Sequence, residues 1–428
     1  MLKQISEVLK YCEDGDIVQV RGWVYRKREF RDKVFIVIRD GEGIIQAVFS
    51  GDLAEEARKL NIESSIIIEG IVKNEPRAPG GKEIHVTKIL WYFIGEPFPI
   101  NVSAAQTDSE YLLDVRHLWI RSRKMWAILR IRHTVFQAIH EYFRKNGFYE
   151  VQCPIFVSAA VEGGATLFPV QYFDRKVYLT QSAQFYLEAM IFTLEKVYTI
   201  APSFRAEPSR TRRHLTEFWH AEAEMAWAHM EDVMKVSEEL VSHIVRKVLD
   251  ERIEELSILK RDIEKLENVK PPFPRVQYDE AIEILKNRGL NIEWGSDLGA
   301  DEERVLMEYF DVPIHLYGFP EHIKAFYHKN DPNDPKRTLS VDVLAPEGYG
   351  EIIGGGERIE DPEMLIEKIK RFGLNPEDYQ WYIDLRRYGS VPHAGFGLGV
   401  DRLVMWICGL DHIRDAVPFP RDIRRVTP

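Results

Sequence analysis

The chain has 428 residues, a formal net charge of −11 and 45% hydrophobic residues. This length exceeds what one compact domain usually holds, and the negative charge argues against indiscriminate nucleic-acid binding. Cys12, Cys153 and Cys408 lie far apart without CxxC spacing, so neither a disulfide framework nor a zinc site is expected. The N-terminal residues include acids and no long apolar run, which argues against a signal peptide or membrane span and favours a cytoplasmic protein.

Residues 1–100 are predicted to form a small β-rich unit. Five short segments are enriched in β-branched residues and separated by Gly, Asp and Pro, with one helix expected over 53–60. Five strands with one helix are typical of an OB-fold, a barrel that often binds single-stranded nucleic acid. Between Arg21 and Arg39, seven basic residues outnumber two acidic ones and alternate with aromatic residues. Trp23 and Phe35 either stack on unpaired bases or belong to the core of the barrel.

Residues 101–128 are expected to form a hinge that faces nucleic acid, because the stretch from Arg116 to Arg132 contains basic residues and no acid. An amphipathic helix is predicted from about Arg130 to Asn146, followed by a strand that ends at Pro154. Residues 244–270 are helical in pattern and rich in charge, so we expect them to form a solvated surface.

The most informative stretch lies between Phe204 and Trp227. Four arginines and His214 surround a turn at Pro208, and apolar, aromatic segments flank them on both sides. The pattern predicts two buried antiparallel strands joined by a cationic loop. Because guanidinium groups clamp phosphate oxygens, such a loop is suited to a polyanion, although a solvated surface hairpin has the same pattern.

A second informative stretch begins at His393. Three alternating glycines, Gly395 to Gly399, precede Arg402 at the start of an apolar, helix-patterned run. Glycines at alternate positions of a strand leave room for a flat ligand close to the backbone. The guanidinium of Arg402 is then suitably placed to stack on an aromatic base.

Together these stretches resemble the signatures of class II aminoacyl-tRNA synthetases of the aspartate, asparagine and lysine subgroup, over essentially the whole chain. The resemblance implies an α+β fold with an OB-fold barrel over 1–100, a hinge over 101–128 and a catalytic domain over 129–428. In this family the catalytic domain has a mixed, mainly antiparallel sheet flanked by helices. The helix and strand that lead to Pro154 resemble the first class II signature, which forms the interface of a homodimer.

The resemblance also implies the residues that bind ATP and catalyse its reaction with an amino acid. Arg205 matches the family's arginine on the α-phosphate, and Glu207 matches the acid that orients the adenine end. His214 and Arg213 are expected to face the outer phosphates. Arg402 completes the catalytic set.

Two further pairs follow from the resemblance. Phe218 and Arg402 match the residues that sandwich the adenine, and Glu351 matches a residue at the ATP site. Asp342 and Glu351 also match the family's magnesium ligands, and both offer the hard oxygen donors that Mg²⁺ prefers. Gly354 departs from the family pattern, which often has a serine that helps to hold the metal. Asp401 replaces the more frequent glutamate before the motif arginine.

The amino-acid site is expected to contain Glu162, Ser182, Gln184, Leu187, Glu222 and Arg358. In aspartyl enzymes a lysine at the position of Leu187 pairs with the substrate carboxylate, and an apolar residue cannot offset the desolvation of a buried carboxylate. Arg358 is retained and can donate to a side-chain carbonyl. Glu222 stands where aspartyl enzymes have aspartate, and its carboxylate can accept from an amide NH₂ and repel a free acid. Asparagine fits both changes.

In the barrel, the resemblance implies that Arg28, Phe35 and Gln46 contact the central anticodon uridine of a tRNA. Glutamine suits this task, because its amide offers both a donor and an acceptor to a uracil edge.

The resemblance is closest to the asparaginyl enzymes of the archaeal and eukaryotic kind. It implies ATP, L-asparagine and tRNA(Asn) as substrates and asparaginyl-adenylate as the intermediate. A non-discriminating aspartyl enzyme is a close alternative, and Leu187 argues against it. An asparagine synthetase paralogue that works through aspartyl-adenylate lacks the anticodon barrel, so residues 1–100 argue against it. A non-catalytic tRNA-binding paralogue would have lost Arg205, Glu207 or Arg402, and this chain has all three.

Overall fold

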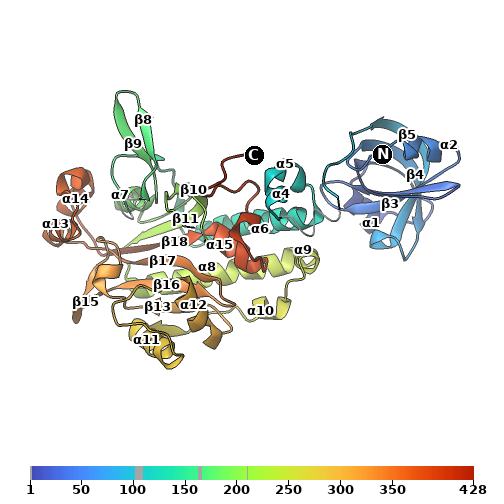
Figure 1. The fold of residues 1–428 in the computed structure, drawn as a ribbon. Helices are drawn as coiled ribbons and strands as arrows, with labels where there is room; N and C mark the ends of the chain where they lie inside the picture. Colours follow the sequence, from blue (N-terminus) through green and yellow to red (C-terminus); the bar gives the residue numbers. More distant parts are fainter. Residues whose placement is uncertain (1, 102–108, 162–165, 210) are drawn as a thin grey trace. The chain divides into compact units, whose positions relative to one another are not determined.

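The computed structural model describes residues 2–101, 109–161, 166–209 and 211–428 (Figure 1). The chain divides into two compact units, Met1–Leu112 and Leu113–Pro428. Within the described ranges, every helix is too short or too polar to span a lipid bilayer.

The first unit is a closed barrel of five strands in the order β1-β2-β3-β5-β4, which confirms the predicted OB-fold. Along β4 the residues alternate between the interior and the outside, with Ile66, Ile68 and Val72 almost completely buried. This period of two is what a strand with one buried face requires. The elements of the unit are α1 (Ile5–Tyr11), β1 (Ile17–Glu29), β2 (Lys33–Arg39), β3 (Ile44–Ser50), α2 (Asp52–Arg58), β4 (Ser65–Asn74) and β5 (Lys82–Phe93).

Trp23 and Phe35 both lie outside the apolar core of the barrel. Trp23 is 43% exposed, and the guanidinium of Arg39 lies 5.0 Å from the centre of its ring. Phe35 is half-buried, with Phe30 packed edge-on at 5.5 Å. Of the two roles considered for these aromatic side chains, the structure therefore excludes that of core residues of the barrel.

The second unit contains a mostly antiparallel sheet of eight strands in the order β12-β13-β16-β17-β18-β11-β10-β6. The β12–β13 and β10–β6 pairs are parallel, so the sheet is mixed, as predicted. Its strands are β6 (Tyr149–Glu150), β10 (Lys196–Phe204), β11 (Glu217–Ala226), β12 (Arg275–Gln277), β13 (Ile314–Tyr317), β16 (Ser340–Ala345), β17 (Gly350–Glu357) and β18 (His393–Gly399). The remaining strands are β7 (Phe156–Val157), β8 (Pro169–Tyr172), β9 (Arg175–Leu179), β14 (Asn330–Asp331) and β15 (Asp334–Thr338).

The main core lies between this sheet and the helices α6, α8 and α15, which run along it in Figure 1. Ala221, Ala223 and Met225 of β11 point into this core, so the intervening even-numbered residues point to the opposite face of the sheet. The larger helices are α6 (Arg123–Lys145), α7 (Gln184–Leu194), α8 (Met230–Glu251), α11 (Tyr278–Asn287), α13 (Pro362–Arg371), α14 (Gln380–Arg387) and α15 (Val400–Ile407). The shorter ones are α4 (Ser109–Asp114), α5 (Arg116–Trp119), α9 (Ile253–Ile258), α10 (Ile263–Glu267) and α12 (Ala300–Leu306).

The prediction that residues 244–270 form a solvated surface is wrong. Ile244, Val248, Leu256 and Leu266 are fully or almost fully buried and belong to the main core. Most charged residues of this stretch are exposed or half-buried, with Glu255 an exception, while its apolar residues follow a helical period. High charge density in the sequence obscured this amphipathic pattern.

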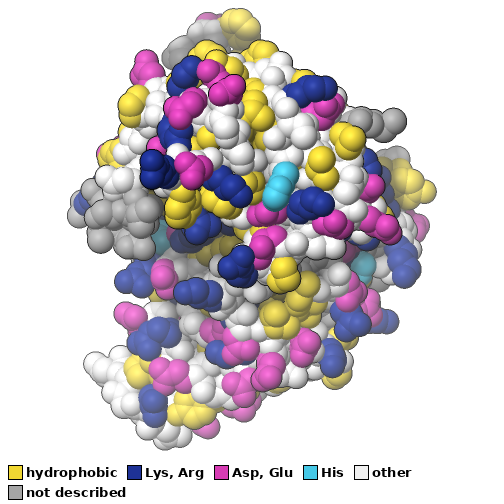
Figure 2. Space-filling view, turned by 90° about the vertical axis from the view of Figure 1, so that its right-hand side faces the viewer, with side chains coloured by type: hydrophobic (Ala, Val, Ile, Leu, Met, Phe, Trp, Pro, Cys, Tyr) yellow, Lys and Arg dark blue, Asp and Glu magenta, His cyan; other side chains and the backbone are white. Residues whose placement is uncertain are grey.

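The range 101–128, expected to be a hinge, includes the first turns of α6, which begins at Arg123. Met125 and Ile128 are completely buried in the main core. Arg116 and Arg132 of the basic run are also buried, Arg116 donating to the backbone carbonyl oxygens of Pro418 and Val417. These two arginines therefore stabilise the fold and are not available to nucleic acid. On the face shown in Figure 2, basic and acidic side chains are interspersed.

Candidate active site

Four neighbouring strands bring the predicted residues onto one face of the sheet. Glu222 of β11 lies opposite Gly397 of β18, Gly397 lies opposite Gly354 of β17, and Gly354 lies opposite Asp342 of β16. Paired residues of adjacent strands point the same way, here away from the helical core. The row therefore has a carboxylate at each end and two glycines between them.

The alternating glycines also serve the packing of β11. A Cβ atom on Gly397 would lie 2.5 Å from Nε2 of His220, and one on Gly395 would lie 2.0 Å from Oε2 of Glu224. Only glycine leaves room for these two side chains, which project from β11 across β18. The alternating glycines thus correctly predicted that other groups lie close to the β18 backbone. They did not show that the side chains of His220 and Glu224 occupy part of the space expected for a ligand.

Two cavities that share lining residues lie on this face. The larger has a volume of about 290 Å³ and is lined by the predicted residues Ser182, Gln184, Leu187, Arg205, Glu222, Asp342, Glu351 and Arg358. The smaller has a volume of about 80 Å³ and is lined by Arg205, Glu207, Arg213, His214, Phe218, Glu351 and Arg402. Arg205 and Glu351 line both cavities.

The smaller cavity has three arginines and an aromatic ring on its walls. The guanidinium of Arg205 lies 5.5 Å from the ring centre of Phe218. Arg402 donates from Nη1 to the backbone carbonyl oxygen of Glu351 at 3.0 Å, which fixes its guanidinium at the cavity. Phe218 and Arg402, the residues expected to sandwich a base, both line this cavity.

His214 and Arg213 lie at the edge of the smaller cavity. Burial and the nearby Arg402 lower the pKa of His214, so the imidazole is mostly uncharged at neutral pH. Nη1 of Arg213 donates to Glu303 at 2.7 Å and to the carbonyl oxygen of Tyr349 at 2.9 Å. Glu303 comes from α12, about 90 positions further along the chain, and no local sequence pattern indicates this partner.

Asp342 and Glu351 converge on Gly354. A Cβ atom at this position would lie 3.0 Å from Oε1 of Glu351 and 3.5 Å from Oδ1 of Asp342. Burial raises the pKa of Asp342 to about 7, although Lys324 donates to it from Nζ at 2.6 Å. Two hard oxygen donors in a space that glycine keeps open fit Mg²⁺. Lys324 follows η4 (Glu321–Ile323), and no motif in the sequence marks it as a residue of the site.

Ser182, Glu222 and Leu187 form one side of the larger cavity. The Glu222 carboxylate is 4% exposed and accepts hydrogen bonds from the Ser182 hydroxyl and from the backbone N–H of Ala183 at 2.8 Å. Leu187 is fully buried and packs in an apolar cluster with Ile191 of the same helix, α7. This side of the cavity is therefore apolar next to a fixed carboxylate.

Arg358, directly after β17, is held by a partner that no sequence pattern indicates. Its guanidinium donates from Nε and Nη2 to the two carboxylate oxygens of Glu224, both at 3.0 Å. Burial alone would lower the pKa of Arg358, but Glu224 at this distance raises it above its ordinary value. The pair is almost completely buried; burial raises the pKa of the Glu224 carboxyl, and the neighbouring Arg358 opposes that rise.

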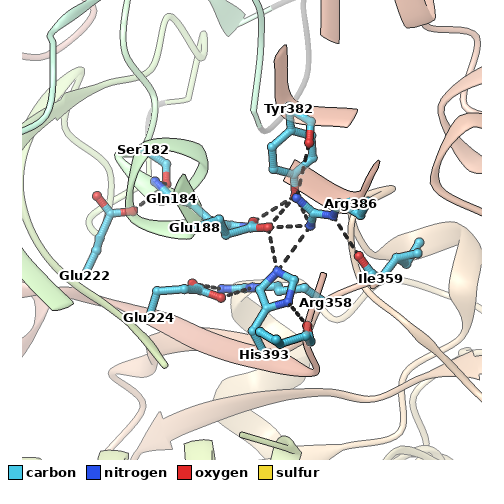
Figure 3. A network of polar contacts seen from close by, with 11 residues as sticks. Ser182, Gln184, Glu188, Glu222, Glu224, Arg358, Ile359, Tyr382, Arg386 and His393 are labelled. Atoms are coloured by element: carbon cyan, nitrogen blue, oxygen red, sulfur yellow. Dashed lines mark hydrogen bonds and ion pairs between the residues drawn. The ribbon is translucent and has the colours of Figure 1, made fainter. Parts of the chain in front are cut away.

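Behind this pair lies a network of buried charges, drawn in Figure 3. The Glu188 carboxylate accepts from the Tyr382 hydroxyl at 2.8 Å, from Nη2 of Arg386, and from His393, whose Nε2 lies at 2.9 Å. Glu188 also accepts from Nε2 of Gln184 at 3.0 Å. Gln184 is the member of this group that lines the larger cavity.

Asp401 has a structural partner on each side. Its carboxylate accepts from Nη1 of Arg132 and from the backbone N–H of Trp219 at 2.9 Å, and it is 1% exposed. It therefore links α15 to α6 and β11. Although aspartate is shorter than glutamate, it reaches both partners here. Glu162, expected at the amino-acid site, lies outside the described residues.

In the barrel, the three residues expected at the anticodon lie on one face of neighbouring strands. Arg28 of β1 is paired with Phe35 of β2. Gln46 of β3 is paired with Val37, which lies two residues after Phe35 on β2. Arg28 is exposed, whereas Gln46 is buried and donates from Nε2 to Glu83 at 2.7 Å. Strand register thus brings them together.

The fold and the site define a class of protein. Residues 108–423 match the family of class II tRNA synthetases (D, K and N), and residues 18–90 match the OB-fold nucleic acid binding domain. Asparagine–tRNA ligase of Thermococcus kodakarensis is 56% identical, over 98% of this chain and 99% of the relative. The crystal structure of asparaginyl-tRNA synthetase from Pyrococcus horikoshii with asparaginyl-adenylate superposes with a TM-score of 0.96, 54% identity and coverage of 100% and 99% of the two chains. Aspartyl-tRNA synthetase of Entamoeba histolytica is less similar, with a TM-score of 0.86, 29% identity and coverage of 100% and 93%. The chain belongs to the asparagine–tRNA ligases within the class II tRNA synthetases.

Proposed function

We propose that this chain activates L-asparagine with ATP and attaches it to tRNA(Asn) through asparaginyl-adenylate. The observation that carries the choice of amino acid is the pairing of Arg358 with Glu224 at 3.0 Å beside the buried Leu187. The guanidinium at this end of the cavity is already neutralised. An aspartate side chain would add a carboxylate near Glu222 and Glu224, and both desolvation and like-charge repulsion oppose this. The neutral carboxamide of asparagine avoids both costs.

The carboxamide also matches the hydrogen-bonding groups around it. An ionised carboxylate accepts about four hydrogen bonds. Glu222 therefore retains acceptor capacity after its bonds with Ser182 and the backbone of Ala183. Its free lone pairs suit the NH₂ group of asparagine, and an N–H of Arg358 suits the carbonyl oxygen.

In the reaction, the α-carboxylate of asparagine attacks the α-phosphorus of ATP and pyrophosphate leaves. The residues contribute position and charge and form no covalent bond with the substrates. Arg205, which lines both cavities, neutralises the oxygens of the α-phosphate as charge accumulates there. Arg402 and Phe218 hold the adenine, with Glu207 at its edge, and His214 and Arg213 are placed toward the outer phosphates.

Asp342 and Glu351 are proposed as ligands of Mg²⁺. When bound, the ion supplies positive charge that stabilises the phosphate oxygens and the leaving pyrophosphate. Lys324 holds Oδ2 of Asp342 at 2.6 Å, so the carboxylate is already turned toward the cavity.

The remaining partners follow from the surfaces of the two units. Arg28, Phe35 and Gln46 are proposed to bind the anticodon of tRNA(Asn). β6 is the last strand of the large sheet, and Tyr149 on it and Phe156 beyond it are more than half exposed. This edge is proposed as the interface of a homodimer, which sedimentation velocity would reveal. Cys12, Cys153 and Cys408 are all free thiols, in keeping with a cytoplasmic enzyme.

Pyrophosphate exchange with asparagine and with aspartate, measured side by side, tests the proposal. Asparagine should support exchange with a kcat/KM several powers of ten higher than aspartate, because the site distinguishes a polar group from a charged one. Equal exchange with aspartate would instead favour a non-discriminating aspartyl enzyme.

A further inference from the structure

Gln184 and Glu188 form a buried pair one turn apart on α7. Nε2 of Gln184 donates to Oε1 of Glu188 at 3.0 Å, and the two residues are 6% and 0% exposed. A glutamine amide has a donating NH₂ end and an accepting oxygen, whereas an ionised carboxylate only accepts. The NH₂ end of Gln184 must therefore face Glu188, and its oxygen is left for other partners.

Glu188 is held in its ionised form by the groups around it. Burial alone would raise its pKa, but Arg386 and His393 hold the pKa below its ordinary value. Tyr382 donates to both of its oxygens, at 2.8 and 2.9 Å. Arg386 is anchored in turn by donating from Nε to the carbonyl oxygen of Ile359 at 2.9 Å. Figure 3 shows these groups converging on the Glu188 carboxylate from α14 and β18.

This cluster is better described as an ion network than as a metal site. Ligand-type atoms of Glu188, Glu224 and His393 do lie within 4.8 Å of one another. However, Arg386 already offsets Glu188, and Arg358 offsets Glu224. A divalent ion there would add positive charge to two neutralised carboxylates, which buried surroundings oppose.

We infer that Glu188 is a positioning residue for the amino-acid substrate, acting through Gln184. By taking the NH₂ end of Gln184, it directs the amide oxygen toward the larger cavity, which Gln184 lines. The amide oxygen of Gln184 can then accept a hydrogen bond from an N–H group of the bound amino acid. It would repel a carboxylate oxygen at the same place. The inference rests on the proposed role of Gln184 in binding asparagine, and it adds the residue that sets the orientation of its amide.

The test is a double-mutant cycle on pyrophosphate exchange. Glu188→Gln allows residue 188 to donate as well as accept, so that Gln184 can turn its NH₂ group toward the cavity. The KM for asparagine should rise about tenfold, as expected for one misdirected hydrogen bond. The KM for ATP should stay within about twofold, because the ATP site is lined by other residues. The preference for asparagine over aspartate should also fall.

The second arm separates positioning from general loosening. In a Gln184→Leu background, Glu188→Gln should cause no further rise in the KM for asparagine, since its target is gone. If the rise in the KM of the double variant equals the product of the rises in the two single variants, the inference is refuted. Glu141→Gln is the matched control, because Gln137 donates to Glu141 at 2.9 Å in the same spacing on the surface of α6. This variant should leave the KM for asparagine unchanged.

Stability is measured on the same variants by thermal unfolding. If Glu188→Gln does not fold, Glu188→Asp retains the charge beside Arg386 but withdraws the carboxylate from Gln184, and it should raise the KM for asparagine several-fold. An unchanged KM in a folded Glu188→Asp enzyme would also refute the inference. Wild-type enzyme that fails to activate asparagine would overturn the proposed function itself, so the two failures are distinct.

Discussion

Leu187→Lys is the substitution that most directly tests how the amino acid is selected. Leu187 is fully buried in the apolar cluster of α7 and also lines the larger cavity. A lysine there places an ammonium at the end of the cavity where Arg358 is already neutralised by Glu224. The variant should therefore activate aspartate better than wild type does, and asparagine less well.

The size of the effect follows from two opposing contributions. Opposite charges about 4 Å apart attract by about 4 kcal/mol at an effective dielectric constant of about 20. Desolvation of the ammonium offsets part of this, which leaves about 1–3 kcal/mol, or roughly 5- to 150-fold in kcat/KM for aspartate. Loss of a buried leucine side chain should also lower the free energy of unfolding by about 2 kcal/mol.

The assay is pyrophosphate exchange with both amino acids across wild type, Leu187→Lys, Glu222→Asp and the double variant. In the double variant, the gain in kcat/KM for aspartate should exceed the product of the gains in the two single variants, because residues 187 and 222 act on one end of the substrate. Leu187→Met is the control: it stays apolar at similar volume and should retain the preference for asparagine. A folded Leu187→Lys enzyme with an unchanged aspartate-to-asparagine ratio would refute the reasoning.

Three further predictions test other parts of the molecule. Arg205→Ala and Arg402→Ala should each cost about 3 kcal/mol of transition-state stabilisation in pyrophosphate exchange, and near-normal rates would contradict their assignment to the ATP site. Phe35→Ala and Gln46→Ala should weaken tRNA charging by about 1–3 kcal/mol while exchange stays unchanged; a parallel fall in both would indicate misfolding. Burial lowers the pKa of His315 to about 4. The unfolded chain, with a histidine pKa near 6.5, therefore binds a proton that the folded protein does not, and stability should fall by about 3 kcal/mol between about pH 6.5 and 4. Denaturant unfolding should show a flatter pH dependence for His315→Asn, and an identical slope would contradict this.

Much of the fold was predictable because its signals are local. The segments around Arg205 and Arg402 each carry their pattern within a few tens of residues, and the barrel strands show the period of two that a half-buried strand requires. The charged stretch 244–270 was misjudged because its buried residues, such as Ile244 and Leu266, are diluted among acids and lysines. Of the basic residues at 116–132, Arg116 and Arg132 turn inward, which the sequence does not show.

By itself, the sequence determined which chemical groups the site has: a cationic loop, a glycine strand, two acids and an apolar residue at 187. Only the tertiary structure decided which of these groups are already paired. Arg358 meets Glu224 across 134 positions of the chain, and Glu188 meets His393 across 205. Such partners come together through strand register and helix packing, which no local pattern records. They determine how much of a buried charge the substrate meets, because a partner offsets part of that charge.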